Sequence, residues 1–165
     1  MKLYNKIIKN YLLLCIIFLS QLLANLIHPP DESVLNYIHV MFKWEAVEHE
    51  TEYEFELSSS SDFYAPLISY KIYDTQYLVK DKISWESIYY WRVRSVGGRW
   101  MNTYSFTTGR TRSDVTVMMH DESQYANGYT IFGTVDGYYS AIIDKNGNEI
   151  WNSGNDSIIY YNFLD

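Results

Sequence analysis

Three short polar clusters hold the residue types that could bind a metal ion or move a proton. They are residues 48–50 (Glu-His-Glu), residues 120–122 (His-Asp-Glu) and residues 144–148 (Asp-Lys-Asn-Gly-Asn). Adjacent residues of a strand point to opposite faces, so both histidine clusters are more typical of solvated turns than of a metal site. An EF-hand calcium loop needs glycine at its sixth position, whereas the glycine of residues 144–148 is the fourth. The sequence therefore predicts no metal site, and it indicates no cofactor.

Three aromatic residues are the candidate binding residues. Trp85, Tyr90 and Trp100 could form an exposed platform on which a sugar ring stacks. The alternative is that Trp85 and Trp100 pack over the ends of a β-sandwich. The sequence contains no glycine-rich phosphate loop, no Ser-His-Asp set and no zinc-ligand spacing, so no catalytic residue is predicted.

Residues 1–24 have the pattern of a secretory signal peptide. Three lysines and no acidic residue precede an almost wholly apolar run, residues 11–23, which ends at Ala24. A membrane-spanning helix needs about 20 predominantly apolar residues. Extended to Ile27, the run reaches only 17 residues, and polar side chains interrupt it. We therefore expect cleavage, export and no membrane span afterwards; an uncleaved anchor is the alternative.

The charge and the cysteine count limit the class of protein. Cys15, the only cysteine, lies in the signal-like segment, so the exported chain would contain no disulfide and no thiolate nucleophile. Cleavage after residue 24 removes three lysines and no acidic residue, and the net charge moves from −7 to −10. This charge excludes a basic surface for nucleic acid. A cysteine-free exported chain indicates a periplasmic, cell-surface or extracellular protein of a bacterium.

Residues 29–108 alternate between apolar and polar side chains with the period of β-strands. In residues 53–57 the apolar side chains alternate with glutamates, which a strand would place together on its wet face. Residues 88–96 repeat this pattern, and polar turns separate the runs. The sequence predicts an all-β fold whose first unit is an antiparallel sandwich. The predicted strands are residues 38–44, 53–57, 67–73, 75–79, 88–96 and 100–108.

This segment resembles a fibronectin type III domain. Trp44 stands where that family keeps its strand-B tryptophan, and Ile83 precedes Tyr89 with the spacing of the family's tyrosine corner. Residues 89–94 are similar to its F strand, and residues 106–108 to the end of its G strand. The resemblance implies that Trp44 and Tyr89 lie in the core. The chain has no Arg-Gly-Asp triplet, so an integrin-binding loop is not implied.

The remainder of the chain, residues 109–165, has a different sequence pattern. Residues 109–113 are a polar linker that predicts a domain boundary. In residues 114–165, Asn-Gly, Asp-Gly and Ser-Gly pairs recur every seven to ten residues between β-rich runs, which predicts an up-and-down meander typical of a propeller blade. The predicted strands are residues 115–119, 129–133, 138–144, 149–152 and 158–163.

Residues 141–151 resemble the blade motif of bacterial arylsulfotransferases and related quinoprotein-like propellers. The resemblance implies an exported enzyme that passes sulfate from an aryl sulfate to a phenolic acceptor, with the sandwich as an accessory module. The catalytic histidines of that family lie in later blades, so none is assigned here. One blade leaves its faces bare, and we expect the chain to be an N-terminal fragment. The alternative function is a non-catalytic cell-surface protein that binds a glycan or a protein.

Overall fold

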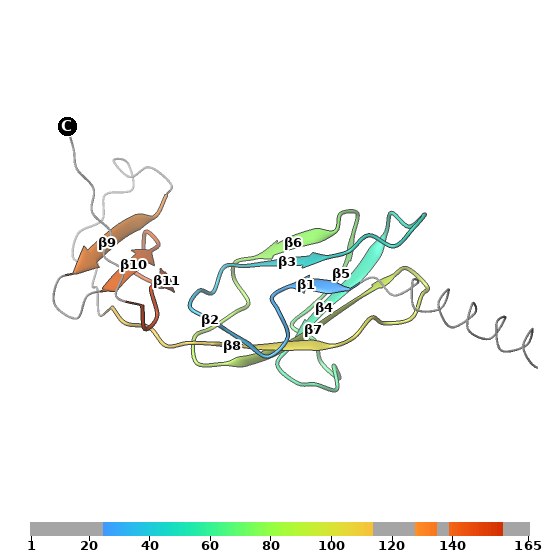
Figure 1. Cartoon of the computed structure of the whole chain (residues 1–165), viewed down its shortest axis with the longest axis horizontal. Helices are drawn as coiled ribbons and strands as arrows, with labels where there is room; N and C mark the ends of the chain where they lie inside the picture. Colours follow the sequence, from blue (N-terminus) through green and yellow to red (C-terminus); the bar gives the residue numbers. More distant parts are fainter. Residues whose placement is uncertain (1–24, 114–127, 135–138, 157–165) are drawn as a thin grey trace, which may run out of the picture.

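The computed structural model describes residues 25–113, 128–134 and 139–156. Within these ranges the chain is all-β, with no helix, and its eleven strands form three sheets that do not close into a barrel (Figure 1). The predicted fold class is confirmed. The predicted signal peptide and the predicted strands 115–119 and 158–163 lie outside the described residues. None of the described residues forms a helix long and apolar enough to cross a membrane.

Two sheets form the sandwich. The first is three-stranded, with the order β1-β3-β6, and the second is five-stranded, with the order β2-β8-β7-β4-β5. The first contains β1 (Leu26–His28), β3 (Val40–Trp44) and β6 (Gln76–Val79). The second contains β2 (Ser33–Leu35), β4 (Tyr53–Ser58), β5 (Ile68–Ile72), β7 (Ile88–Ser95) and β8 (Tyr104–Thr108).

One strand pair departs from the predicted antiparallel arrangement, because β2 runs parallel to β8. The cis peptide bond between His28 and Pro29 lies where the chain leaves β1 and crosses to the other sheet. There Asp31 Oδ1 accepts a hydrogen bond from the Ser105 amide at 2.7 Å, and Glu32 N–H donates to the Ser105 carbonyl at 2.8 Å. These bonds fix the first segment of the chain against β8.

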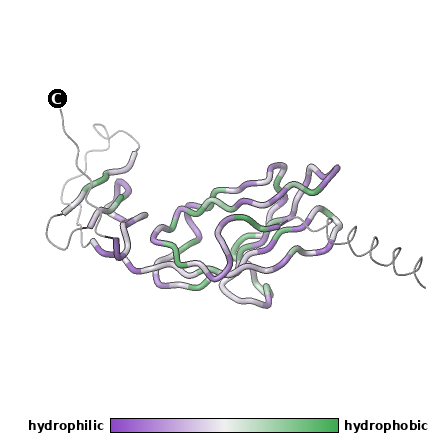
Figure 2. Tube along the Cα trace, in the orientation of Figure 1, coloured by the Kyte–Doolittle hydropathy of each residue, from purple (hydrophilic) through white to green (hydrophobic). Residues whose placement is uncertain are grey.

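The sandwich core lies between the two sheets and is rich in aromatic rings. Trp44 and Tyr89, which the sequence predicts as core residues, are 2% and 5% exposed. Phe42 is fully buried and packs edge-on against Phe55 and Trp91, with ring centroids 4.9 and 5.1 Å apart. Figure 2 shows hydrophobic and hydrophilic residues interleaved along these strands, as expected for strands with one buried face.

The third sheet is a three-stranded meander at one end of the sandwich (Figure 1). It contains β9 (Thr130–Thr134), β10 (Tyr139–Ile143) and β11 (Glu149–Asn152), with β10 in the centre and antiparallel to both neighbours. The predicted strand 149–152 is therefore confirmed, and the predicted strands 129–133 and 138–144 are found with bounds shifted by one residue where they are described. The assignment of this sheet to a propeller stays a prediction.

Candidate functional site

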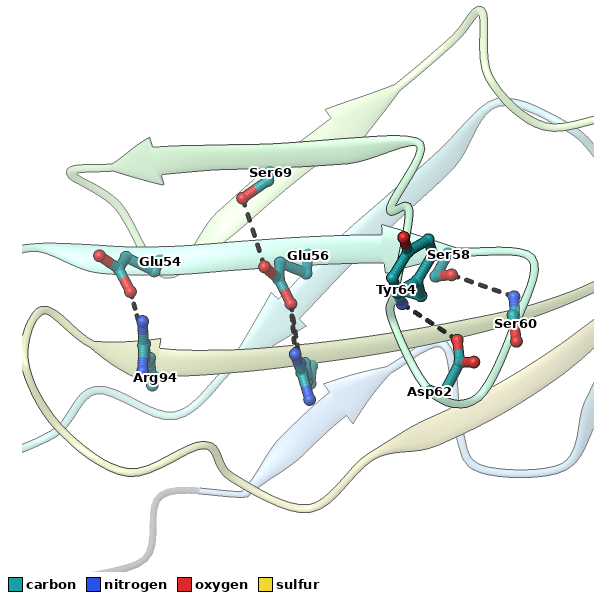
Figure 3. Close-up of polar contacts among 9 residues, drawn as sticks. Glu54, Glu56, Ser58, Ser60, Asp62, Tyr64, Ser69 and Arg94 are labelled. Atoms are coloured by element: carbon teal, nitrogen blue, oxygen red, sulfur yellow. Dashed lines mark hydrogen bonds and ion pairs between the residues drawn. The ribbon is translucent and has the colours of Figure 1, made fainter.

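A ladder of ion pairs covers the outer face of the five-stranded sheet. Arg92 on β7 contacts Glu56 Oε2 on β4 with two nitrogens, at 2.9 Å from Nε and 2.7 Å from Nη2. Arg94 pairs with Glu54 through its Nε, two residues along both strands (Figure 3). The side chains of Glu54 and Glu56 are only 27% and 15% exposed. The glutamates do lie on the outer face, as predicted, but they are ion-paired and half-buried because the arginines cover them.

Aromatic rings stack on these arginines. The Arg92 guanidinium lies 4.0 Å from the ring centroid of Phe63 and 4.2 Å from that of Trp100. Arg94 also lies over the Trp100 ring, at 4.2 Å. Phe63 has a positive φ of 54°, a strained conformation for an aromatic residue, and this brings its ring under the guanidinium. The two rings and the two guanidinium groups form one continuous stack.

The three predicted platform residues do not come together. Trp100 is used within the stack, and Tyr90 lies on the same outer face of β7, two residues before Arg92. Trp85 lies elsewhere, because its Nε1–H donates a hydrogen bond of 2.8 Å to the Glu149 carbonyl of the third sheet. All three side chains are half-buried. The sugar-binding platform and its packing alternative both stay predictions.

The junction between the sandwich and the third sheet is the second candidate site. Backbone hydrogen bonds on both sides of Tyr37 join the sandwich to the third sheet. Ile38 N–H donates to the Ile150 carbonyl at 3.0 Å, and Asn152 N–H donates to the Asn36 carbonyl at 2.9 Å. Tyr37 and Trp151 form an isolated antiparallel bridge between these bonds. The turn that precedes β3 therefore acts as an additional strand segment beside β11.

Glu149 holds the predicted linker against this junction. The residue is 5% exposed, and its carboxylate accepts hydrogen bonds from the Ser113 amide at 2.7 Å and the Arg112 amide at 3.1 Å. The Ser113 hydroxyl donates to the same carboxylate, as does Asn152 Nδ2 at 2.5 Å. These N–H and O–H donors supply the hydrogen bonds that the buried Glu149 carboxylate needs. Residues 109–113 are thereby fixed to β11.

A polar cleft of about 680 Å³ opens on one side of the junction. Asn36, Arg110 and Asn152 line it, together with Gly154. Gly154 has a φ of 59°, and a Cβ at this position would clash with the side-chain amide of Asn36. The cleft therefore depends on glycine at position 154. Clefts at the interface between two units are common places for small-molecule sites.

A second cleft, of about 520 Å³, also lies at the junction and brings together several charged groups. His39, Lys80, Asp81 and Asp144 line it. Burial and the nearby Lys80 charge lower the pKa of His39, although Asp144 opposes this shift. Burial acts to raise the pKa of Asp144, but hydrogen bonds from residues 146 and 148 and the His39 charge outweigh it, so the pKa is lowered.

The two polar clusters that the structure describes, residues 48–50 and 144–148, both lie in turns. Asp144 Oδ1 accepts from the amides of Asn146 and Asn148 at 2.8 and 2.9 Å, so this carboxylate closes a hairpin turn. His49 and Glu48 lie 3.2 Å apart, with side chains 89% and 88% exposed. Residues 120–122 lie outside the described residues. Among the residues that the structure describes, no group of three His, Cys, Asp or Glu side chains could hold a metal ion.

Sequence reasoning missed Glu149, Asn36 and the arginine ladder as organising residues. The ladder did leave a signal, since Glu54 and Glu56 repeat at the same two-residue spacing as Arg92 and Arg94. Glu149 and Asn36 left none, because the contacts that join the linker to Glu149 and Asn36 to Asn152 span more than 30 residues of sequence. Comparison with known protein families, with curated proteins and with solved structures finds no match for this chain.

Proposed function

We propose that residues 29–108 form a fibronectin type III-like accessory module that holds the start of an arylsulfotransferase-like propeller in an exported protein. The observation that carries the proposal is the junction. Backbone hydrogen bonds, the Tyr37–Trp151 bridge and the buried Glu149 carboxylate attach the third sheet to the end of the sandwich. A flexible spacer would need none of these contacts, whereas a module that orients a neighbouring unit requires them.

The fibronectin-like part of the proposal is supported by local geometry around Tyr89. The Tyr89 hydroxyl accepts a hydrogen bond of 2.8 Å from the Ser84 amide, five residues upstream. A buried tyrosine near the start of its strand, bonded back to the preceding backbone, is the tyrosine corner of immunoglobulin-like sandwiches. The division into sheets of three and five strands around a core that contains Trp44 and Trp91 is compatible with the same assignment.

Export is supported by the first described residues. Leu26, the second residue after the proposed cleavage point, is 5% exposed and belongs to the core. The backbone nitrogen of Asn25 lies 3.1 Å from Glu45 Oε2. After cleavage this nitrogen would be an α-ammonium group paired with a carboxylate. Mass spectrometry of the exported protein should find a mature N-terminus at or near Asn25, and a membrane-bound protein that retains Met1 would contradict this part of the proposal.

Sulfate transfer from a chromogenic aryl sulfate to a phenol tests the enzymatic part. We expect turnover by a longer protein in which this chain precedes the later blades and none by the 165 residues alone, because the resemblance places the catalytic histidines in those later blades. Turnover by the 165-residue chain would contradict the accessory role. Inactivity of both proteins would remove the sulfotransferase assignment and leave the binding function.

A binding protein for a surface glycan or protein is the second candidate. The observation that favours it is a group of exposed aromatic side chains near β5, in which Tyr64 and Tyr73 are 93% and 73% exposed. Tyrosine is common at recognition surfaces because its ring combines apolar area with a polar hydroxyl. A glycan array probed with the exported chain tests this function, and a Tyr64→Ala, Tyr73→Ala double variant is the matched control for any signal.

A further inference from the structure

The free edge of the five-stranded sheet is an association surface in its own right. β5 is hydrogen-bonded to β4 on one side, and within the described residues no strand pairs with its other side. The pairing with β4 runs through five consecutive residue pairs without a bulge. Alternate residues of such an edge strand present unpaired N–H and C=O groups outward, where another strand can bind them.

Tyr70, the central residue of β5, faces the core side of this edge and is nevertheless exposed. It pairs in register with Phe55, which is fully buried, so both side chains lie on the core-facing side of the sheet. Its neighbours on that side, Ile68 and Ile72, are buried, but Tyr70 is 60% exposed. Partial burial raises the pKa of Tyr77 on β6, and the nearby Tyr70 phenol adds to this shift. Tyr70 thus stands at the open seam between the two sheets.

The edge lacks two of the devices that normally prevent strand addition, a bulge and a charged side chain that points inward. Natural edge strands are protected by these devices, by proline, by lysine on the edge or by short length. β5 has no bulge, and its inward side chains are Ile68, Tyr70 and Ile72. Its one charge, Lys71, lies on the outer face with Ser69. Leu67 and Tyr73, which flank the strand, are 41% and 73% exposed and extend the apolar surface.

We propose that a second copy of this chain binds here, through antiparallel β5–β5 pairing about a two-fold axis at Tyr70. The strand is self-complementary in this register. Tyr70 lies opposite itself, Ile68 lies opposite Ile72, and Ser69 lies opposite Lys71. No like charges face one another, and the aromatic and β-branched cross-strand pairs are of the stabilising kind. The two five-stranded sheets then form one continuous sheet, and the interface is isologous.

This inference is independent of the proposed enzymatic role, because it uses only residues at the edge away from the junction. A foreign strand would need no particular residue at position 70. A second copy places that residue on the symmetry axis, so a substituted residue 70 lies opposite the same substituted residue of the other copy. This difference makes the occupant testable.

Sedimentation velocity of the full chain over the micromolar range measures the association. The unmodified chain should form dimers. Tyr70→Lys should weaken association by about tenfold or more, because it removes the Tyr–Tyr pair and places two lysines opposite each other. Tyr70→Asp should do the same. A mixture of the Tyr70→Lys and Tyr70→Asp variants should recover the dimer, since a lysine then faces an aspartate.

Two controls separate this result from misfolding and from nonspecific charge effects. Tyr64→Lys makes the same chemical change off the strand, at a residue that is 93% exposed, and should leave the dimer intact. Circular dichroism and thermal unfolding should show both Tyr70 variants folded. A monomeric unmodified chain would overturn the proposal, and so would a dimer that Tyr70→Lys does not weaken. Failure of the mixed variants to associate would overturn the two-fold register at Tyr70.

Discussion

The sandwich and the third sheet are stabilised by different means. The sandwich buries a continuous cluster of seventeen apolar residues between two sheets. In the described part of the third sheet, the buried apolar residues are Ala141, Ile143 and Ile150, accompanied by buried polar residues such as Glu149 and Asn152. Apolar burial stabilises a unit in any context, whereas buried polar groups need specific partners. The sandwich should therefore fold by itself, and the third sheet should depend on its hydrogen bonds to the sandwich.

The largest effect should come from the sandwich core. Trp44 is 2% exposed and contacts the rings of Tyr53 and Phe55. Trp44→Ala should lower the free energy of unfolding by about 3 to 5 kcal/mol, as truncation of large buried aromatic residues does. Chemical denaturation followed by far-ultraviolet circular dichroism measures this loss. Tyr64→Ala, at an exposed position, should change stability by less than about 0.5 kcal/mol.

The next largest effect should come from the junction. Glu149→Gln replaces an acceptor oxygen by an amide that meets the donors of Arg112, Ser113 and Asn152. We expect a local loss of about 1 to 3 kcal/mol, because buried donors then lack a partner. Amide hydrogen exchange should accelerate in β10 and β11 and stay unchanged in β4 and β7. Glu48→Gln, at an exposed side chain, is the matched control, and equal acceleration in both regions would contradict local dependence.

A smaller effect should come from the outer ladder. Arg92→Lys retains the charge but loses the two-nitrogen contact with Glu56 and the stacking on Phe63 and Trp100. We expect a loss of about 0.5 to 1 kcal/mol for this half-buried, partly screened group. A double-mutant cycle with Glu56→Gln separates the ion pair from the stacking. A coupling energy near zero would mean that the contribution of Arg92 to stability comes from stacking and not from the ion pair with Glu56.

The smallest effect should be a pH dependence at His28, whose Nε2 lies 2.9 Å from the Tyr37 hydroxyl. Burial, followed by the Lys43 charge, lowers the pKa of His28 below its usual 6.5. The unfolded chain then binds the proton more readily, so the contribution of His28 is present above about pH 6.5 and is lost as the pH falls through the folded pKa. His28→Gln should flatten thermal stability between pH 7 and pH 5 relative to the unmodified chain.

The difference between the two regions also explains what the sequence could predict. Alternation in residues 53–57 and 88–96 identified β4 and β7, and Trp44 and Tyr89 identified the core, because these signals are local. β1 and β2 have three residues each, too few for a period to be visible. The junction was not predictable, since Glu149 and Asn36 acquire their roles only from segments distant in sequence.

The platform residues illustrate the same limit. Trp85, Tyr90 and Trp100 are aromatic residues in a strand-rich segment, and their types alone do not say whether their rings face solvent. Stacking of Trp100 on two arginines and the hydrogen bond from Trp85 to β11 depend on partners that residue type cannot identify.

Native-state hydrogen exchange of the whole chain, read by mass spectrometry strand by strand, tests most directly that the third sheet depends on the sandwich. Two levels of protection are expected. Amides of β3, β4 and β7 should exchange through global unfolding. Amides of β10 and β11 should exchange through a local opening of lower free energy, which Glu149→Gln accelerates. A single level of protection across all five strands, equally affected by Trp44→Ala and Glu149→Gln, would contradict it.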